Sequence, residues 1–231
     1  MALDLASDFD FRFERKYHIV DLPAEEIEAW VLRCRAFFRE AYAPRYINNI
    51  YFDTRSLGNY FQNLDGVANR TKIRIRWYGD LFGTVSRPVL EYKIKRGMLG
   101  TKDSHRLSGF EFGSGFCEEA LEAVFEKSQL EEGVRRELSF VTPTLVNRYH
   151  RKYFISADRN YRITIDTELD FYRIGPRDNH FIVKRSLEGS TVMELKYSGK
   201  IAELNEGMVN FFPFRVTRMS KYVTGVELVE L

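Results

Sequence analysis

Apolar and polar residues alternate strictly along several short segments of the chain. In KIRIRWYG (72–79), Lys72, Arg74 and Arg76 alternate with isoleucine and tryptophan. A period of two residues is that of a β-strand, whose successive side chains point to opposite faces. Such runs predict strands at 11–19, 46–54, 71–79, 89–97, 145–156, 161–169, 180–184 and 191–197. The tetrapeptide ADRN (157–160) between two of these runs predicts a hairpin.

Other segments have the spacing of helices. The segment 23–42 places Pro23 in its first turn, has acidic residues near its start, and carries an apolar stripe that includes Trp30 and Phe37. Helical segments are also predicted at 56–63, 116–138 (one helix, or two broken at Gly133) and 200–211, with a last helix or strand at 220–231. Loops are expected at 79–88 and 97–107. The chain has no obvious linker or repeat, so we expect a single domain over 1–231 with a disordered tail at 1–9.

The overall charge is nearly balanced, with 35 Lys and Arg against 33 Asp and Glu and a net charge of +2. This does not favour a general nucleic-acid binder, so any basic site must come from the arrangement of charges. Cys34 and Cys117 lie at apolar positions without a CxxC motif, which predicts buried free thiols in a reducing compartment. The four histidines show no metal-ligand spacing. With no signal peptide and no apolar run of roughly 18 residues, we expect a cytoplasmic protein without direct membrane insertion.

Cations recur on one face of the predicted strands, with apolar neighbours on the other. They are Lys16, Arg74, Arg76, Lys93, Arg151, Arg162 and Lys196. The glutamates on these faces are Glu14, Glu91 and Glu194. Asp166 in addition shares a face with Arg162. One explanation is a sheet with a solvated, ion-paired outer face. The excess of cations and the apolar stripes of the helices favour another, in which the apolar faces cover the helices and the charged faces line the interior of a closed sheet that holds a polyanion.

A series of motifs in this sequence resembles the VTC domain. They are ERKY (14–17), IYFDT (50–54), KIRIRWYG (72–79), LEYKIKRG (90–97), YHRKYF (149–154), RITIDTEL (162–169), VMELKY (192–197) and SKYVTG (220–225). The VTC domain is the polyphosphate-polymerase domain of the vacuolar transporter chaperone family, and it belongs to the CYTH-like superfamily of triphosphate tunnel metalloenzymes. The resemblance runs in order from about residue 10 to residue 226.

The resemblance implies an α+β fold, with a closed eight-stranded antiparallel β-barrel and helices packed on its outside. It implies that ATP or inorganic polyphosphate binds in the tunnel together with Mn²⁺ or Mg²⁺, and that the γ-phosphate of ATP is transferred to a growing polyphosphate chain. Export of the polymer would then need a separate membrane-protein partner. Such chemistry depends on positioning and charge neutralisation more than on a protein nucleophile.

The same resemblance assigns roles to individual residues. Those expected to act on the transferred phosphate are Arg74, Arg76, Lys93, Arg151, Arg162 and Lys221. Further phosphate contacts are expected from Lys16, Lys196, Lys72, Lys95 and Ser220. The metal ligand is expected to be Glu194, with Glu14 or Glu91. Lys102, in the polar segment GMLGTKDS (97–104), is a further candidate substrate contact; the spacing of this segment does not match a P-loop.

One difference from the superfamily pattern narrows the range of possible functions. The first strand of the wider superfamily often reads Glu-x-Glu-x-Lys, whereas Arg12 stands here in place of the first Glu. This weakens a thiamine-triphosphatase or cyclase interpretation and leaves fewer metal ligands. Three functions stay open: a polyphosphate polymerase, a hydrolase of tripolyphosphate or nucleoside triphosphates, and a non-catalytic polyphosphate-binding or sensing module. The retained Glu194 favours an enzyme over a simple binder.

Overall fold

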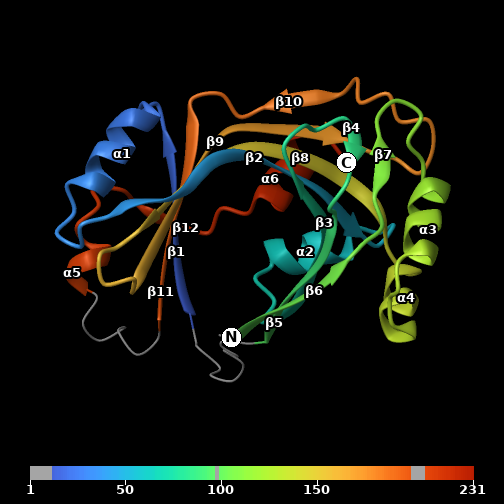
Figure 1. Cartoon of the computed structure of the whole chain (residues 1–231), viewed down its shortest axis with the longest axis horizontal. Coiled ribbons are helices and arrows are strands. Elements are labelled where there is room, and N and C mark those ends of the chain that lie inside the picture. Colours follow the sequence, from blue (N-terminus) through green and yellow to red (C-terminus); the bar gives the residue numbers. More distant parts are fainter. Residues whose placement is uncertain (1–11, 97–98, 199–205) are drawn as a thin grey trace, which may run out of the picture.

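The chain folds around one strongly arched antiparallel sheet (Figure 1). The computed structural model describes residues 12–96, 99–198 and 206–231. Eight long strands follow one another across the sheet in the order β1 (Arg12–Val20), β11 (Ser190–Ser198), β9 (Tyr161–Arg173), β8 (Thr142–Ile155), β2 (Arg39–Asp53), β3 (Asn69–Tyr78), β5 (Val89–Arg96) and β6 (Leu99–Arg106). The short strands β12 (Val216–Thr217) and β10 (Lys184–Ser186) pair with β1 and β9, and β4 (Gly83–Val85) and β7 (Phe110–Phe112) form a separate ribbon.

The eight-stranded antiparallel order agrees with the prediction, but closure into a barrel is not observed. The hydrogen-bonded path ends at β12 on one side and at β6 on the other, with no backbone pairing between these ends in the described ranges. A side-chain contact spans the interior instead, because Lys93 Nζ on β5 lies 3.4 Å from Glu14 Oε2 on β1. The two limbs of the arch in Figure 1 therefore meet through charges and not through strand hydrogen bonds.

The outer face of the arch is apolar and is covered by helices. Ile75 and Trp77 of β3 pack into one buried cluster with residues of α3 (Glu118–Lys127) and α4 (Glu132–Leu138). A second cluster joins Ile163 of β9 and Leu195 of β11 to Ile27 of α1 (Ala24–Leu32). Figure 1 shows α1 and the short α5 (Glu206–Val209) beside one limb and α3 and α4 beside the other. The charged strand faces consequently point inward, which confirms that part of the prediction.

Helix α6 (Lys221–Leu228) contradicts the expectation that helices pack only outside. It lies within the span of the arch, beside α2 (Gly58–Leu64) (Figure 1). Its Tyr222 and Val226 share a buried cluster with Leu145 and Phe171, which stand on the inner face of β8 and β9. Gly225 permits this approach, because a Cβ at this position would lie 2.4 Å from Leu145 Cδ2 and 2.5 Å from Phe171 Cδ1.

Two segments have a secondary structure that differs from the one predicted for them. The helix expected at 23–42 ends at Leu32, and β2 begins at Arg39, where long-range pairing with the end of β8 overrides the helical pattern. Phe37 is 74% exposed with a positive φ, and Trp30 is 36% exposed, so neither belongs to the core that the stripe predicted. The loop expected at 97–107 contains the edge strand β6, whose mostly exposed residues show no apolar alternation.

Other boundaries were predicted more closely. The hairpin of β8 and β9 is confirmed around 157–160. The segment 116–138 forms two helices, and the break falls between Lys127 and Glu132 rather than at Gly133, which lies inside α4. The strand expected at 180–184 is wrong except at Lys184, the first residue of β10.

The remaining predictions on elements and cysteines are tested only in part. The chain's last predicted element is the helix α6. Of the helix expected at 200–211, the structure describes only residues 206–211, which contain α5, and the predicted tail at 1–9 lies outside the described residues. Both cysteines are free; Cys34 is buried and Cys117 half-buried. None of the helices in the described ranges combines the length and apolar character needed to cross a bilayer.

Candidate functional site

The strand register brings a set of charged side chains from seven of the eight long strands, all except β2, onto the inner face of the arch, where Lys221 of α6 joins them. Opposite one another stand Lys16 and Glu194, Lys196 and Arg162, Arg151 and Asp166, Arg74 and Glu91, and Lys72 and Lys93. We call the following set the charged interior: Lys16, Lys72, Arg74, Arg76, Lys93, Lys95, Lys102, Arg151, Arg162, Lys196, Lys221, Glu14, Glu91, Asp166 and Glu194. Eleven cations face four carboxylates, so the set carries a large formal excess of positive charge.

Asp166 anchors two cations that come from different parts of the fold. Arg151 on β8 donates from Nε to Asp166 Oδ1 at 2.5 Å and from Nη2 to Oδ2 at 2.6 Å. Lys221 of α6 places its Nζ 2.6 Å from the same Oδ2. The Asp166 side chain has no solvent exposure; burial by itself would raise the pKa of its carboxyl, but Arg151 and Lys221 hold that pKa below its ordinary value. This pairing ties α6 to the sheet through charge.

Glu91 joins the cations of β3 to the edge strand. Its Oε2 accepts from Arg74 Nε at 2.8 Å and lies 3.6 Å from Arg76 Nη1, while its Oε1 lies 2.5 Å from Lys102 Nζ. Burial opposes ionisation, but the neighbouring arginines and Lys102 lower the pKa of Glu91 to about 2. Arg76 is further oriented by Asn49, whose Oδ1 accepts from its Nε at 3.1 Å. Lys102 thus lies on the inner face, in a strand and not in a loop.

Glu14 and Glu194 share one lysine. Lys16 Nζ lies 3.1 Å from Glu14 Oε1 and 3.6 Å from Glu194 Oε1, and Lys196 Nζ lies 3.0 Å from Glu194 Oε2. Burial and the charge of Glu194 would raise the pKa of Glu14, yet Lys16, Lys93 and Lys196 lower it to about 2. The pKa of Glu194 is likewise held well below its usual value, because its lysine neighbours outweigh the effect of burial. Both carboxylates are therefore ionised at neutral pH.

The geometry allows a limited test of the metal assignment. The described residues contain no group of three or more His, Cys, Asp or Glu side chains arranged to hold a metal ion. Mg²⁺, however, is commonly held by one or two carboxylates together with substrate phosphates and water. Glu14 and Glu194, which approach the same ammonium group, fit that arrangement. Glu91 fits it less well, because Arg74, Arg76 and Lys102 already surround its carboxylate.

Lys72 is a half-buried cation of the set whose pKa lies far below its ordinary value. Burial, followed by repulsion from Lys16 and Lys93, lowers its pKa to about 6. Its Nζ donates a hydrogen bond to Ser220 Oγ at 3.0 Å. Ser220 is also the N-cap of α6, since its Oγ accepts from the backbone of Val223 at 3.4 Å. The predicted phosphate contact at Ser220 is therefore part of the link between β3 and α6.

Two predicted residues stand apart from these clusters. Arg162 and Lys95 lie on the inner face by register, opposite Lys196 and Arg70 respectively. Arg162 is exposed and Lys95 is half-buried, and within the described ranges neither forms an ion pair. Their side chains are free to reach a bound anion, and their assignment as phosphate contacts stays a prediction.

Sequence analysis did not assign several polar residues that contact the cations or, in the case of Asn147, contact a residue that does so. They are Asp166, Asn49, Tyr51, Asn147 and Tyr149. Alternation in YINNIYFD (46–53) and RITIDT (162–167) could have placed some of them on the charged face. The role of Asp166 could not be foreseen in that way, because it depends on where α6 packs.

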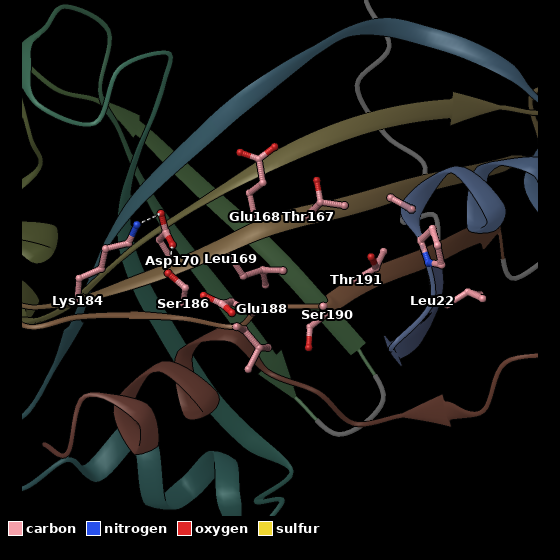
Figure 2. A pocket seen from close by; sticks show the side chains of 14 residues that line it. Leu22, Thr167, Glu168, Leu169, Asp170, Lys184, Ser186, Glu188, Ser190 and Thr191 are labelled. Atoms are coloured by element: carbon pink, nitrogen blue, oxygen red, sulfur yellow. Dashed lines mark hydrogen bonds and ion pairs between the residues drawn. The ribbon is translucent and has the colours of Figure 1, made fainter.

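A cavity of about 530 Å³ lies elsewhere, between the start of α1 and the β10–β11 connection (Figure 2). Its lining includes three carboxylates, Glu168, Asp170 and Glu188, and one lysine, Lys184. Figure 2 shows Lys184 directed at Asp170, and the two groups are 2.9 Å apart. This excess of acid opposes phosphate binding, so the charged interior is the better candidate site.

Comparison with known proteins agrees with this geometry. The chain matches the VTC domain over residues 11–230. Its structure resembles that of a putative adenylate cyclase from Vibrio parahaemolyticus, at 11% identity and a TM-score of 0.54, with 96% of this chain and 99% of that chain covered. It also resembles a protein from Pyrococcus horikoshii, at 12% identity and a TM-score of 0.51, with 94% and 99% covered. At these sequence identities, the structural similarities support only a shared fold. No curated protein matches the chain.

Proposed function

This chain belongs to the VTC domain family, and from that premise we propose that its charged interior binds the phosphate chain of ATP and transfers the γ-phosphate to inorganic polyphosphate, leaving ADP. The observation that carries the proposal is the convergence of eleven cations and four carboxylates on one face of the arch. In the absence of ligand, the carboxylates pair with eight of these cations, whereas Lys72, Lys95 and Arg162 have no ion pair within the described ranges. A phosphate chain supplies the negative charge that the set still lacks.

The residues of the charged interior suit the chemistry of phosphoryl transfer. A terminal oxygen of the acceptor chain attacks the γ-phosphorus, the bond from that phosphorus to the bridging oxygen breaks, and ADP leaves with the electron pair. Arg74, Arg76 and Arg151 offer planar donor forks that match phosphate oxygens. Lys93 and Lys221 serve as point charges toward the same chain. The attacking oxygen is already anionic at neutral pH. The protein therefore has to position the two phosphate chains and neutralise their charge, and it does not have to remove a proton.

Further residues complete the proposed site. Additional phosphate contacts are proposed from Lys16, Lys72, Lys95, Arg162, Lys196 and Ser220. Glu194, with Glu14, would hold Mn²⁺ or Mg²⁺, which would supply charge neutralisation and alignment of the phosphate oxygens. A cytoplasmic location and a separate membrane-protein partner for polymer export stay predictions.

The direct test incubates the purified protein with ATP and Mn²⁺ or Mg²⁺ and measures ADP, free phosphate and long-chain polyphosphate together. ADP with polymer is the expected result. Free phosphate without polymer would replace the proposal with a hydrolase. Tight binding of polyphosphate without any product would replace it with a binding or sensing module.

A variant pair tests the metal assignment within that assay. Glu194→Gln removes the charge but keeps the size of the side chain, so metal-dependent turnover should fall at least tenfold while tripolyphosphate still binds. Glu188→Gln removes an exposed carboxylate in the acidic cavity and should leave turnover unchanged. Turnover of Glu194→Gln at the parental rate would show that the metal is held elsewhere.

A further inference from the structure

A cluster of aromatic side chains, two of them exposed and Tyr153 half-buried, surrounds Arg45 on the inner face of the sheet. The guanidinium carbon of Arg45 lies 4.1 Å from the ring centroid of Tyr78 and 5.1 Å from that of Tyr153. Arg45 Nε donates to Tyr153 Oη at 3.2 Å, and the ring of Tyr42 packs edge-to-face on Tyr153 with centroids 5.7 Å apart. Tyr42 is nevertheless 67% exposed and Tyr78 47% exposed. We call Tyr42, Arg45, Tyr78 and Tyr153 the aromatic rim.

The register places this rim beside the charged interior. Arg45 stands opposite Arg151 in the pairing of β2 with β8, and Tyr42 stands opposite Tyr153. Tyr153 and Tyr78 each follow a cation of the charged interior by two residues on the same strand face, a distance of about 6.6 Å along a strand. Tyr78 is the last residue of β3, which puts the rim at one end of that row.

The local backbone of β2 is irregular at this place. The pairing with β8 shifts register between Glu40 and Tyr42 and again between Tyr42 and Arg45. Bulges of this kind re-aim side chains and are frequent next to binding sites. Here they bring Tyr42 and Arg45 together over Tyr153, where a regular strand would have spaced them differently. The two bulges thus help to build the rim.

We propose that the aromatic rim binds the nucleobase of a nucleoside triphosphate whose phosphate chain lies in the charged interior. This inference rests on the proposed function and adds the part of the donor that the cations do not recognise. Every nucleobase has a π-face that stacks on aromatic rings, so rings and a guanidinium suit a base. A bare phosphate chain has no π-face on which these rings could stack. The rim therefore distinguishes the nucleotide donor from the inorganic acceptor.

The experiment measures dissociation constants for ATP and for inorganic tripolyphosphate by calorimetry, on the wild type and on single variants. Tyr42→Leu and Tyr78→Leu should weaken ATP binding by about fivefold or more, in keeping with the loss of base stacking. Binding of tripolyphosphate should change less than about twofold, because no phosphate contact is removed. Tyr78→Phe keeps the ring and should retain ATP affinity. Phe140→Leu, at a residue 70% exposed after α4, is the matched control for loss of a surface ring.

The outcomes separate this inference from the function on which it rests. If the wild type binds both ligands and the Tyr→Leu variants lose ATP and tripolyphosphate affinity equally, or lose neither, base recognition at the rim is refuted while the phosphate site stands. If the wild type binds neither ligand, the proposed function falls and the inference falls with it. A selective loss for ATP, with rescue in Tyr78→Phe, is the supporting result.

Discussion

Replacing Asp166 with asparagine tests whether this carboxylate holds the charged interior together in the absence of ligand. The substitution keeps the shape of the side chain and removes the charge that pairs with Arg151 and Lys221. Both cations would then be left without their closest anion in a region that water hardly reaches. We expect the free protein to lose stability and α6 to lose its charged link to β9.

The magnitude follows from burial. The side chain of Asp166 is 0% exposed, and those of Arg151 and Lys221 are 10% and 9% exposed. Removing one partner of a buried ion pair typically costs about 3–5 kcal/mol, because the remaining charge is uncompensated. For a chain of this size, that loss corresponds to a fall in melting temperature of about 6–20 °C.

The assay compares thermal and urea unfolding with and without tripolyphosphate. A bound phosphate can supply the missing negative charge, so the ligand should stabilise Asp166→Asn more than it stabilises the wild type. Asp170→Asn is the control on the same strand. Its partner Lys184 is 47% exposed, and a pair of that kind is worth about 0–1 kcal/mol.

The reasoning is refuted if Asp166→Asn loses less than about 1 kcal/mol of unfolding free energy, since that is the range of a surface pair. It is also refuted if the two variants respond equally to tripolyphosphate. The first result would mean that packing alone holds α6 and Arg151, and the second that a bound phosphate does not replace the charge of Asp166.

Two further predictions concern other parts of the site. Because the pKa of Lys72 in the free protein is about 6, binding tripolyphosphate should add a proton to this amine, and affinity should fall as pH rises above that value. Lys72→Arg stays charged, so its calorimetric pH profile should be flatter; parallel profiles would contradict the assignment. Gly225→Ala should cost about 1–3 kcal/mol in urea unfolding, because the added methyl group overlaps Leu145 and Phe171. Gly133→Ala has no atom within 4 Å of the new Cβ and should not destabilise; equal losses in both variants would argue against close packing at α6.

Local alternation was enough to predict most strands and the direction of the charged faces. In KIRIRWYG the arginines point inward and Trp77 outward, as the period of two requires once the apolar side is covered by helices. The alternation did not predict the structure correctly in segments where apolar and polar residues do not separate onto two strand faces. Strand β6 is polar on both faces, and the residues before β2 have an apolar spacing that resembles a helix although Phe37 is exposed.

The sequence by itself therefore determined which residues are strand-forming, which face of each strand is charged and which family the motifs resemble, because these depend on neighbours a few positions apart. Only the tertiary structure decided which carboxylate serves which cation. Asp166 and Lys221 are brought together by the packing of α6 against the inner face, which Gly225 allows. Tyr42, Tyr78 and Tyr153 meet through bulges and pairings between three strands. Such contacts join residues far apart in the chain, and no local pattern encodes them.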